Sequence, residues 1–310
     1  MDLDGPLAAL LDPVLLLRAF YLAAAALILL ISAVPALSDR FLAYGSRSAR
    51  SPAPRNAPTV LARVLDHLTT YRVPHLYFAH FYILSILSSL FWAHQIWTRG
   101  PGFELLATFV PEDSPTMTLP QIYMVWALML LQGVRRLLEC LVSASNSMST
   151  MWIGHYILGH LFYLAVNISI WIEGVQAIRA PSPSSHPQPA FSSLILPLVL
   201  PILLAAHVGQ HSYHAYLSSL RATKHSYSLP SHPLFPNAIC PHYTLETLIY
   251  ICLALLAAPE GRLVNWTVAT GAVFVAVNLG VTAHGTKAWY VDQFGEEKVA
   301  QRWKMVPWVW

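Results

Sequence analysis

A polar stripe within an otherwise apolar sequence is the first feature that could do chemistry. If HVGQHSYHAYLSSLR (207–221) is helical, Gln210, His214 and Arg221 lie along one face at intervals of one or two turns. Such a stripe could enter a membrane cavity and bind a polar ligand. The alternative, which the pattern leaves open, is an interfacial helix whose histidine and arginine are only solvated.

The same stretch has histidine spacing that a metal ion could use. His207, His211 and His214 can converge on one ion, as in the histidine boxes of membrane di-iron enzymes. Outside 207–214 the histidines, of which the chain has 14, are scattered singly and form no second HxxHH cluster. We therefore expect no metal site.

LQGVRRLLEC (131–140) places two adjacent arginines and a glutamate at the end of an apolar run. A guanidinium group is costly at membrane depth unless it faces a polar cavity, a partner charge or the interface. CPHYTLETLIY (240–250) begins like a helix, with His242 and Glu246 one turn apart. Glu246 is either an interfacial carboxylate or an acceptor of hydrogen bonds from an amide or a ribose, and the pattern does not decide between them.

VPHLYFAHFYIL (73–84) brings His80 and Tyr82 to the mouth of another apolar run. An aromatic belt at a membrane interface explains its tyrosines and phenylalanines without any function. A histidine within such a belt is rarer, and it could transfer protons near neutral pH.

The elements that must position these groups are membrane helices. Of the 310 residues, 55% are hydrophobic and 11% are charged, which is more apolar than a water-soluble core of this length requires. We expect an all-α, polytopic bundle of about seven transmembrane helices in one membrane domain, 1–310. Runs close to the ~20 apolar residues that cross a bilayer lie near Ala19–Leu37, Leu76–Ile96, Leu119–Val142, Trp152–Val175, Phe191–Val208, Leu245–Ala257 and Val264–Ala283.

The charges predict an orientation. Six arginines follow the first run within 40–72, whereas Asp2 and Asp4 precede it, so the positive-inside rule places the N-terminus in the lumen and, after seven crossings, the C-terminus in the cytosol. The net charge of +3 is small and its cations lie beside membrane segments, so nucleic acid is not an expected partner. No GxGxxG or GxxxxGK[ST] motif is present, and side chains on helices must hold any nucleotide. The three cysteines have no paired spacing and indicate neither disulfides nor a redox motif.

Taken together, five stretches resemble the steroid 5-alpha-reductase family, and within it the polyprenol reductase branch. They follow one another in the family's order over about three-quarters of the chain, and the C-terminal part, about 191–310, resembles the family's catalytic domain. HFY and RRLLEC favour the polyprenoid branch over the steroid branch. The stretches are FAHFY (78–82), QGVRRLLEC (132–140), HAYLSSLR (214–221), CPHYTLE (240–246) and WYVDQFGEEKVAQRWKMVPWVW (289–310).

The resemblance implies a multi-pass protein of the endoplasmic reticulum membrane that binds NADPH from the cytosol. The enzyme would saturate the alpha-isoprene double bond of a long-chain polyprenol or polyprenal, supplying dolichol for protein N-glycosylation. We expect catalysis from His80, Tyr82 and Glu246, with Glu139 as a partner in the same polar cluster. The residues implied for cofactor binding are Arg135, Arg136, Gln210, His214, Arg221, His242, Glu246, Lys287, Tyr290 and Arg302.

The sequence departs from the family pattern at two places. Lys287 in TKAWY stands where the family usually has a histidine, and the spacer before Arg302 is one residue longer. A lysine there could still neutralise a phosphate as a point charge. Other readings are a steroid or enone 5-alpha-reductase, an enoyl reductase of the same superfamily, a membrane isoprenylcysteine-type methyltransferase, and a transporter or scaffold that grips anionic lipid.

Overall fold

The computed structural model describes residues 11–42, 59–142, 149–180, 195–223 and 227–310. This part of the chain is mostly helical. Its longer helices are α2 (Pro13–Ala33), α5 (Phe78–Thr98), α7 (Leu119–Val142), α8 (Ile153–Ile172), α10 (Leu196–Thr223), α11 (Pro241–Leu256) and α12 (Trp266–Phe294). Its shorter elements are α3 (Pro35–Phe41), α4 (Val60–Leu68), β1 (Arg72–Pro74), the 3-10 helix η2 (His75–Tyr77), α6 (Pro101–Ala107), β2 (Thr150–Trp152), α9 (Val175–Arg179) and α13 (Glu296–Val299).

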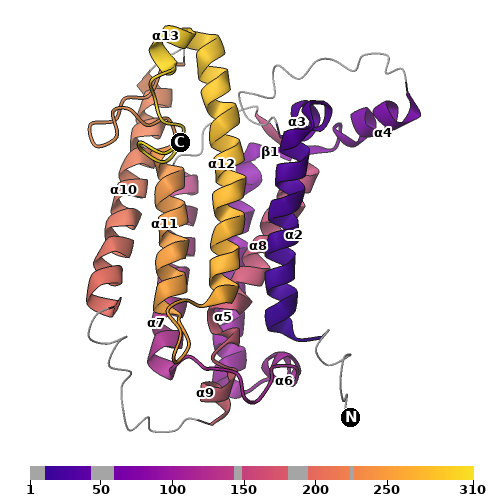
Figure 1. Ribbon diagram of the computed structural model, residues 1–310, viewed down its shortest axis with the longest axis vertical. Helices are drawn as coiled ribbons and strands as arrows, with labels where there is room; N and C mark the ends of the chain where they lie inside the picture. Colours follow the sequence, from indigo (N-terminus) through magenta and orange to yellow (C-terminus); the bar gives the residue numbers. More distant parts are fainter. Residues whose placement is uncertain (1–10, 43–58, 143–148, 181–194, 224–226) are drawn as a thin grey trace.

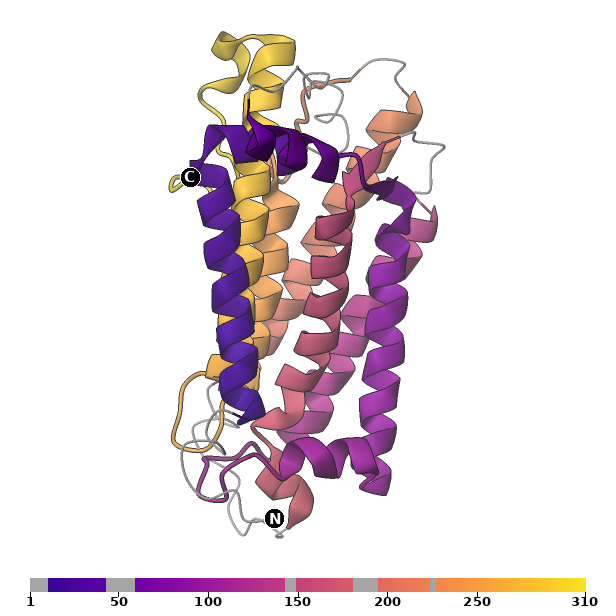
Figure 2. The same cartoon turned by 90° about the vertical axis from the view of Figure 1, so that its right-hand side faces the viewer.

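The longer helices run side by side and form a bundle, as Figures 1 and 2 show from two directions. Each of them overlaps one of the seven apolar runs. Four segments are long and apolar enough to cross a membrane: 13–33, 75–98, 153–172 and 266–294. The chain is therefore a multi-pass membrane protein, whereas the number of seven crossings and the direction of the termini stay predictions.

Close packing within the bundle depends on small residues and aromatic rings. A Cβ added to Gly133 of α7 would lie 3.3 Å from Ile86 and 3.4 Å from Ser85, so α5 and α7 approach closely there. In the core, the Phe162 ring stacks on Phe274 with centroids 5.2 Å apart and meets Tyr250 edge-on at 5.6 Å. These rings join α8, α11 and α12 at the height where the functional site lies.

The two ends of the bundle are built differently. At one end, α6 and α9 lie together, and Arg18 of α2 donates to Glu173 at 2.9 Å. At the other end, β1 pairs antiparallel with β2, and the chain after α13 folds back over the start of α11 and the last part of α12. There Ile239 N donates to the Trp303 carbonyl at 2.9 Å, and Thr244 Oγ1 to that of Met305 at 2.6 Å. The candidate site lies toward this second end.

Candidate active site

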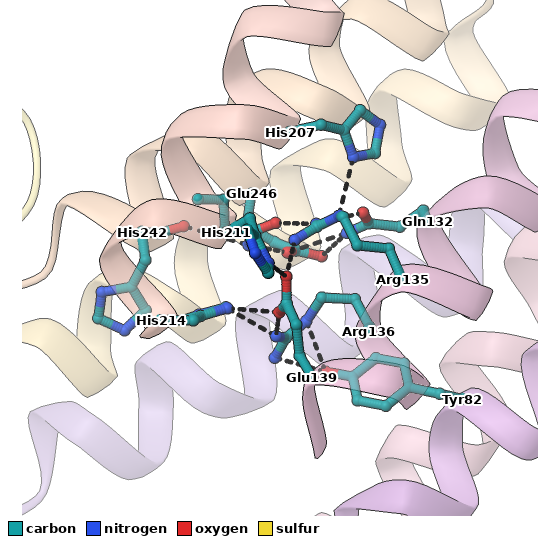
Figure 3. Close-up of polar contacts among 11 residues, drawn as sticks. Tyr82, Gln132, Arg135, Arg136, Glu139, His207, His211, His214, His242 and Glu246 are labelled. Carbon is teal, nitrogen blue, oxygen red and sulfur yellow. Dashed lines mark hydrogen bonds and ion pairs between the residues drawn. The ribbon is translucent and has the colours of Figure 1, made fainter. Parts of the chain in front are cut away.

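One face of α7 carries a row of polar side chains that points into the bundle. Gln132, Arg135, Arg136 and Glu139 follow one another at helical spacing. Gln132 is fully buried and Glu139 is 8% exposed. Figure 3 shows this row meeting side chains from α10 and α11.

Arg135 holds together the part of this polar cluster that lies between α7 and α10. Its Nε donates to His207 Nδ1 at 3.2 Å, and its Nη2 donates to Gln132 Oε1 at 2.7 Å and also to Gln210. Its Nη1 donates to Glu139. The planar guanidinium thus binds four side chains at once, which a lysine could not do.

Arg136, although adjacent, faces a different group. Its Nε and Nη2 donate to Tyr82 Oη on α5, at 3.2 and 2.9 Å. Its Nη1 forms an ion pair with Glu139. A phenol that accepts two hydrogen bonds from an arginine keeps its own proton to donate, and no acceptor for that proton lies among the described residues.

The Glu139 carboxylate is shared between the two arginines and two histidines of α10. His214 Nδ1 lies 2.7 Å from Glu139 Oε2, and His211 Nδ1 lies 2.9 Å from Oε1. His207 instead accepts from Arg135. His211 and His214 thus share the Glu139 carboxylate, whereas His207 faces Arg135.

Glu246 is the second carboxylate of the cluster, and it accepts hydrogen bonds from two side-chain amides. Gln132 Nε2 donates to its two oxygens at 2.9 and 3.0 Å, and Gln210 Nε2 donates to it from α10. The formal charges of the two arginines and the two glutamates cancel. This balance offsets the cost of placing ions deep in the bundle.

A cavity of about 200 Å³ opens beside the cluster. One side of it is polar, with Arg136, Gln210, His214, His242 and Glu246. The lining that comes from α5, β2, α8 and α12 is mostly apolar and aromatic, although it also includes His155 and Asn278; its apolar members are Phe78, Phe81, Met151, Leu158, Phe162, Phe274, Val275 and Leu279. The phenols of Tyr82, Tyr163 and Tyr250 also line it. Such a cavity can hold a polar ligand against an apolar one.

Some predicted site residues lie elsewhere. His80 is not among the cavity-lining residues; its Nδ1 lies 2.8 Å from Tyr156 Oη, and its ring stacks on Tyr77 with centroids 4.5 Å apart. Arg221 is in the last turn of α10, and its side chain lies outside those that the structure describes.

The predicted residues of the C-terminal signature lie together at the end of the bundle. Lys287 Nζ donates to the carbonyls of Ala300 and Arg302, at 2.8 and 2.6 Å. Arg302 Nη1 donates to the Pro230 carbonyl, and Tyr290 stacks on Phe294. Through these hydrogen bonds Lys287 holds the tail against α12, and Arg302 holds the 227–240 segment against the tail.

His232 fixes the segment before α11 to α10. It is 7% exposed, Leu234 N donates to its Nδ1 at 3.1 Å, and its Nε2 lies 3.2 Å from Ser212 Oγ. Burial lowers the pKa of His232, so this histidine is neutral and its Nε2 donates to Ser212. The segment covers the polar end of the site without adding charge to it.

Three residues of the site were not predicted from the sequence. Gln132 could have been found, because it stands three residues before Arg135 and seven before Glu139 on the same helical face. Tyr163 and Tyr250 gave no signal, since a tyrosine in an apolar helix looks the same whether it packs in a core or lines a cavity.

Comparison with known proteins shows which proteins this chain resembles. Residues 181–310 match the family model described as 3-oxo-5-alpha-steroid 4-dehydrogenase. The chain is 26% identical to polyprenal reductase 1 of Oryza sativa subsp. indica over 313 residues, covering 84% of this chain and 86% of that protein. It is 28% identical to the polyprenal reductase of Saccharomyces cerevisiae, covering 76% and 75% of the two chains. The chain is thus similar to polyprenal reductases over most of its length, and its C-terminal part matches the steroid dehydrogenase family. These findings confirm the resemblance stated from the sequence. They also confirm the prediction of an oxidoreductase that acts on a CH–CH group.

Proposed function

We propose that this protein is an NADPH-dependent reductase of the endoplasmic reticulum membrane that saturates the alpha-isoprene double bond of polyprenal, supplying dolichol for protein N-glycosylation. The observation that carries the proposal is the two-sided cavity. The polar lining of the cavity includes Arg136, Gln210 and Glu246, and the apolar lining is largely aromatic. Tyr82 Oη accepts a hydrogen bond from Arg136. The names of the relatives from rice and yeast support the class of substrate.

The polar side of the cavity fits the nicotinamide and ribose of NADPH. A carboxamide and ribose hydroxyls need both donors and acceptors, and Gln210, His214, His242 and Glu246 present both. These four residues and Arg136 would hold that end, while Lys287, Tyr290, Arg302 and Arg221 remain the proposed residues for the rest of the dinucleotide. When bound there, NADPH supplies a hydride.

The chemistry of the substrate favours the aldehyde over the alcohol. Hydride adds readily to an alkene only when the negative charge it creates is delocalised. In an enal, addition at the β-carbon moves the π electrons through the α-carbon onto the carbonyl oxygen and gives an enolate. A plain allylic alcohol offers no such acceptor, so polyprenal is the immediate substrate in our proposal.

Tyr82 is placed to supply the proton in this reaction. Its phenol lines the cavity, accepts twice from Arg136, and keeps its own proton for the carbonyl oxygen. The adjacent guanidinium stabilises negative charge on the phenol oxygen after transfer. Protonation of the α-carbon by solvent, with return of the enol O–H proton to the Tyr82 oxygen, then gives the saturated aldehyde and restores the phenol. The net change is addition of one hydride and one proton across the double bond.

The proposal is tested with purified protein, NADPH, and polyprenal or polyprenol supplied separately. We expect the near-ultraviolet absorbance of NADPH to fall with polyprenal, and the product to gain two hydrogen atoms by mass spectrometry. A rigid steroid enone serves as the matched carbonyl control, and S-adenosylmethionine as the competing cofactor in binding titrations. Faster reduction of polyprenol with no oxidising partner present, preference for the enone, or binding of S-adenosylmethionine in place of NADPH would each contradict the proposal.

A further inference from the structure

Tyr250 carries a buried hydroxyl that the fold itself does not use. It lies on α11, one turn after Glu246, is 1% exposed and lines the cavity. Among the described residues no group lies at normal hydrogen-bonding distance and angle from its Oη, although the Tyr163 phenol is close enough to interact with it. Buried polar atoms without a partner are rare in folded proteins, because their lost hydration is not replaced. A ligand that enters the cavity would satisfy this one.

Two other phenols line the cavity close to Tyr250. Tyr82 from α5, Tyr163 from α8 and Tyr250 are near enough to interact electrostatically with one another and with Glu246. The Tyr82 and Tyr163 rings meet edge-on with centroids 5.6 Å apart, and Tyr250 packs edge-on against Phe162 at the same distance. This packing limits how far the hydroxyls can turn. Tyr82 and Tyr250 each hold a proton for which no acceptor at normal hydrogen-bonding distance lies among the described residues, and only the Tyr163 phenol interacts with Tyr250 more weakly.

We propose that the Tyr250 phenol donates a hydrogen bond to the carbonyl oxygen of the substrate head group, beside Tyr82. This inference rests on the proposed function, and it adds a second catalytic donor to it. A carbonyl oxygen has two lone pairs and can accept from both phenols. Negative charge grows on this oxygen as hydride adds to the β-carbon, so both bonds strengthen in the transition state. An alcohol oxygen gains no such charge, and the pair of donors therefore selects an enal.

A phenol that only packs in the core would behave differently, and Tyr21 provides the matched control. Tyr21 is also fully buried but does not line the cavity, and its Oη lies 2.9 Å from Ser169 Oγ. Tyr21→Phe removes a satisfied hydrogen bond and should lower Tm while leaving kcat unchanged. Tyr250→Phe removes a hydroxyl that makes no hydrogen bond at normal distance in the fold, so Tm should not fall.

The decisive measurements are kcat for polyprenal and the carbonyl stretching frequency of bound, carbonyl-labelled polyprenal by isotope-edited infrared spectroscopy. Removing one donor from an oxyanion site lowers kcat about 10²- to 10³-fold, and we expect a loss of that size in Tyr250→Phe. The hydrogen bond lowers the carbonyl frequency in the wild-type protein, and the frequency should rise in Tyr250→Phe but not in Tyr21→Phe. The infrared measurement needs no cofactor.

The outcomes separate this inference from the proposed function. If the wild-type protein does not reduce polyprenal, the proposed function fails. If it does, and Tyr250→Phe keeps the wild-type kcat or the wild-type carbonyl frequency, the role of Tyr250 is overturned and the proposed function stands. A fall in Tm for Tyr250→Phe that matches the fall for Tyr21→Phe also overturns it, because the hydroxyl would then have a partner in the fold.

Discussion

Glu139→Gln tests how the polar cluster is held together. The Glu139 carboxylate is 8% exposed and interacts with both Arg135 and Arg136 and with two histidines of α10. Glutamine keeps the shape of the side chain and one acceptor oxygen, but it removes the negative charge. Two guanidinium groups then remain in the cluster with one carboxylate, that of Glu246.

The size of the effect follows from burial. Removing one partner of a buried ion pair costs about 3–5 kcal/mol, because the other charge stays in a poorly solvated place. In large domains about 1 kcal/mol lowers Tm by roughly 2 °C. Glu139→Gln should therefore melt about 6–10 °C below the wild-type protein, measured by tryptophan fluorescence of the detergent-solubilised protein.

Glu104→Gln is the control for the chemical change itself. Glu104 lies 3.5 Å from Arg179, but its side chain is 48% exposed. An exposed pair of this kind contributes about 0–1 kcal/mol, so the Tm of the control should fall by less than about 2 °C. If Glu139→Gln melts as close to wild type as Glu104→Gln does, the cluster does not depend on its shared carboxylate and our account of it is wrong.

Three further substitutions test single residues of the site. Glu246→Gln should lower Tm less than Glu139→Gln, because Glu246 accepts from amides and not from guanidinium groups. It should lower kcat/KM about 10- to 100-fold, since a charge-assisted hydrogen bond contributes roughly 1.5–3 kcal/mol; unchanged kinetics would remove Glu246 from the site. Tyr82→Phe should lower kcat about 10²- to 10³-fold with little change in NADPH affinity. His80→Phe is measured beside it, and the variant with the larger loss of kcat identifies the proton donor. Arg221→Ala should raise KM for NADPH about 10- to 100-fold, with Arg221→Lys between, if the guanidinium binds phosphate through two hydrogen bonds; equal KM values in all three proteins would make Arg221 only a positive-inside anchor.

The positions of the long helices could be predicted because apolar runs of sufficient length have few alternatives. The ends were harder to place. The runs at 191–208 and 264–283 stop where polar residues begin, whereas α10 continues to Thr223 and α12 to Phe294. These extensions stay helical because their polar side chains find partners, such as Glu139 for His214 and the tail carbonyls for Lys287. A hydropathy profile does not take such partners into account.

The site could be predicted in outline but not in its contacts. Spacing placed Gln210 and His214 on one face and put two arginines near them. Spacing alone could not show which arginine faces the cavity. Adjacent residues of a helix point about 100° apart, and the polar cavity could have lain in either of these two directions. The structure shows that Arg136 lines the cavity and that Arg135 binds Gln132, Gln210 and His207 behind it.

The distribution of charge suggests where each end of the proposed cofactor would bind. The cluster around Glu139 and Glu246 is neutral overall, which suits the uncharged carboxamide of a nicotinamide and offers nothing to a phosphate. Toward the tail, Lys287 and Arg302 donate to backbone carbonyls, which carry no formal charge and so do not cancel their cationic charge. Burial and the nearby Lys287 ammonium lower the pKa of Lys304, as expected where cations gather. Within 287–304 four cations, Lys287, Lys298, Arg302 and Lys304, outnumber three carboxylates, Asp292, Glu296 and Glu297, whereas a phosphate bound beside Glu246 would meet a carboxylate. In our proposal the phosphates of the dinucleotide therefore bind at the tail end, and the hydride-donating ring binds beside the phenols.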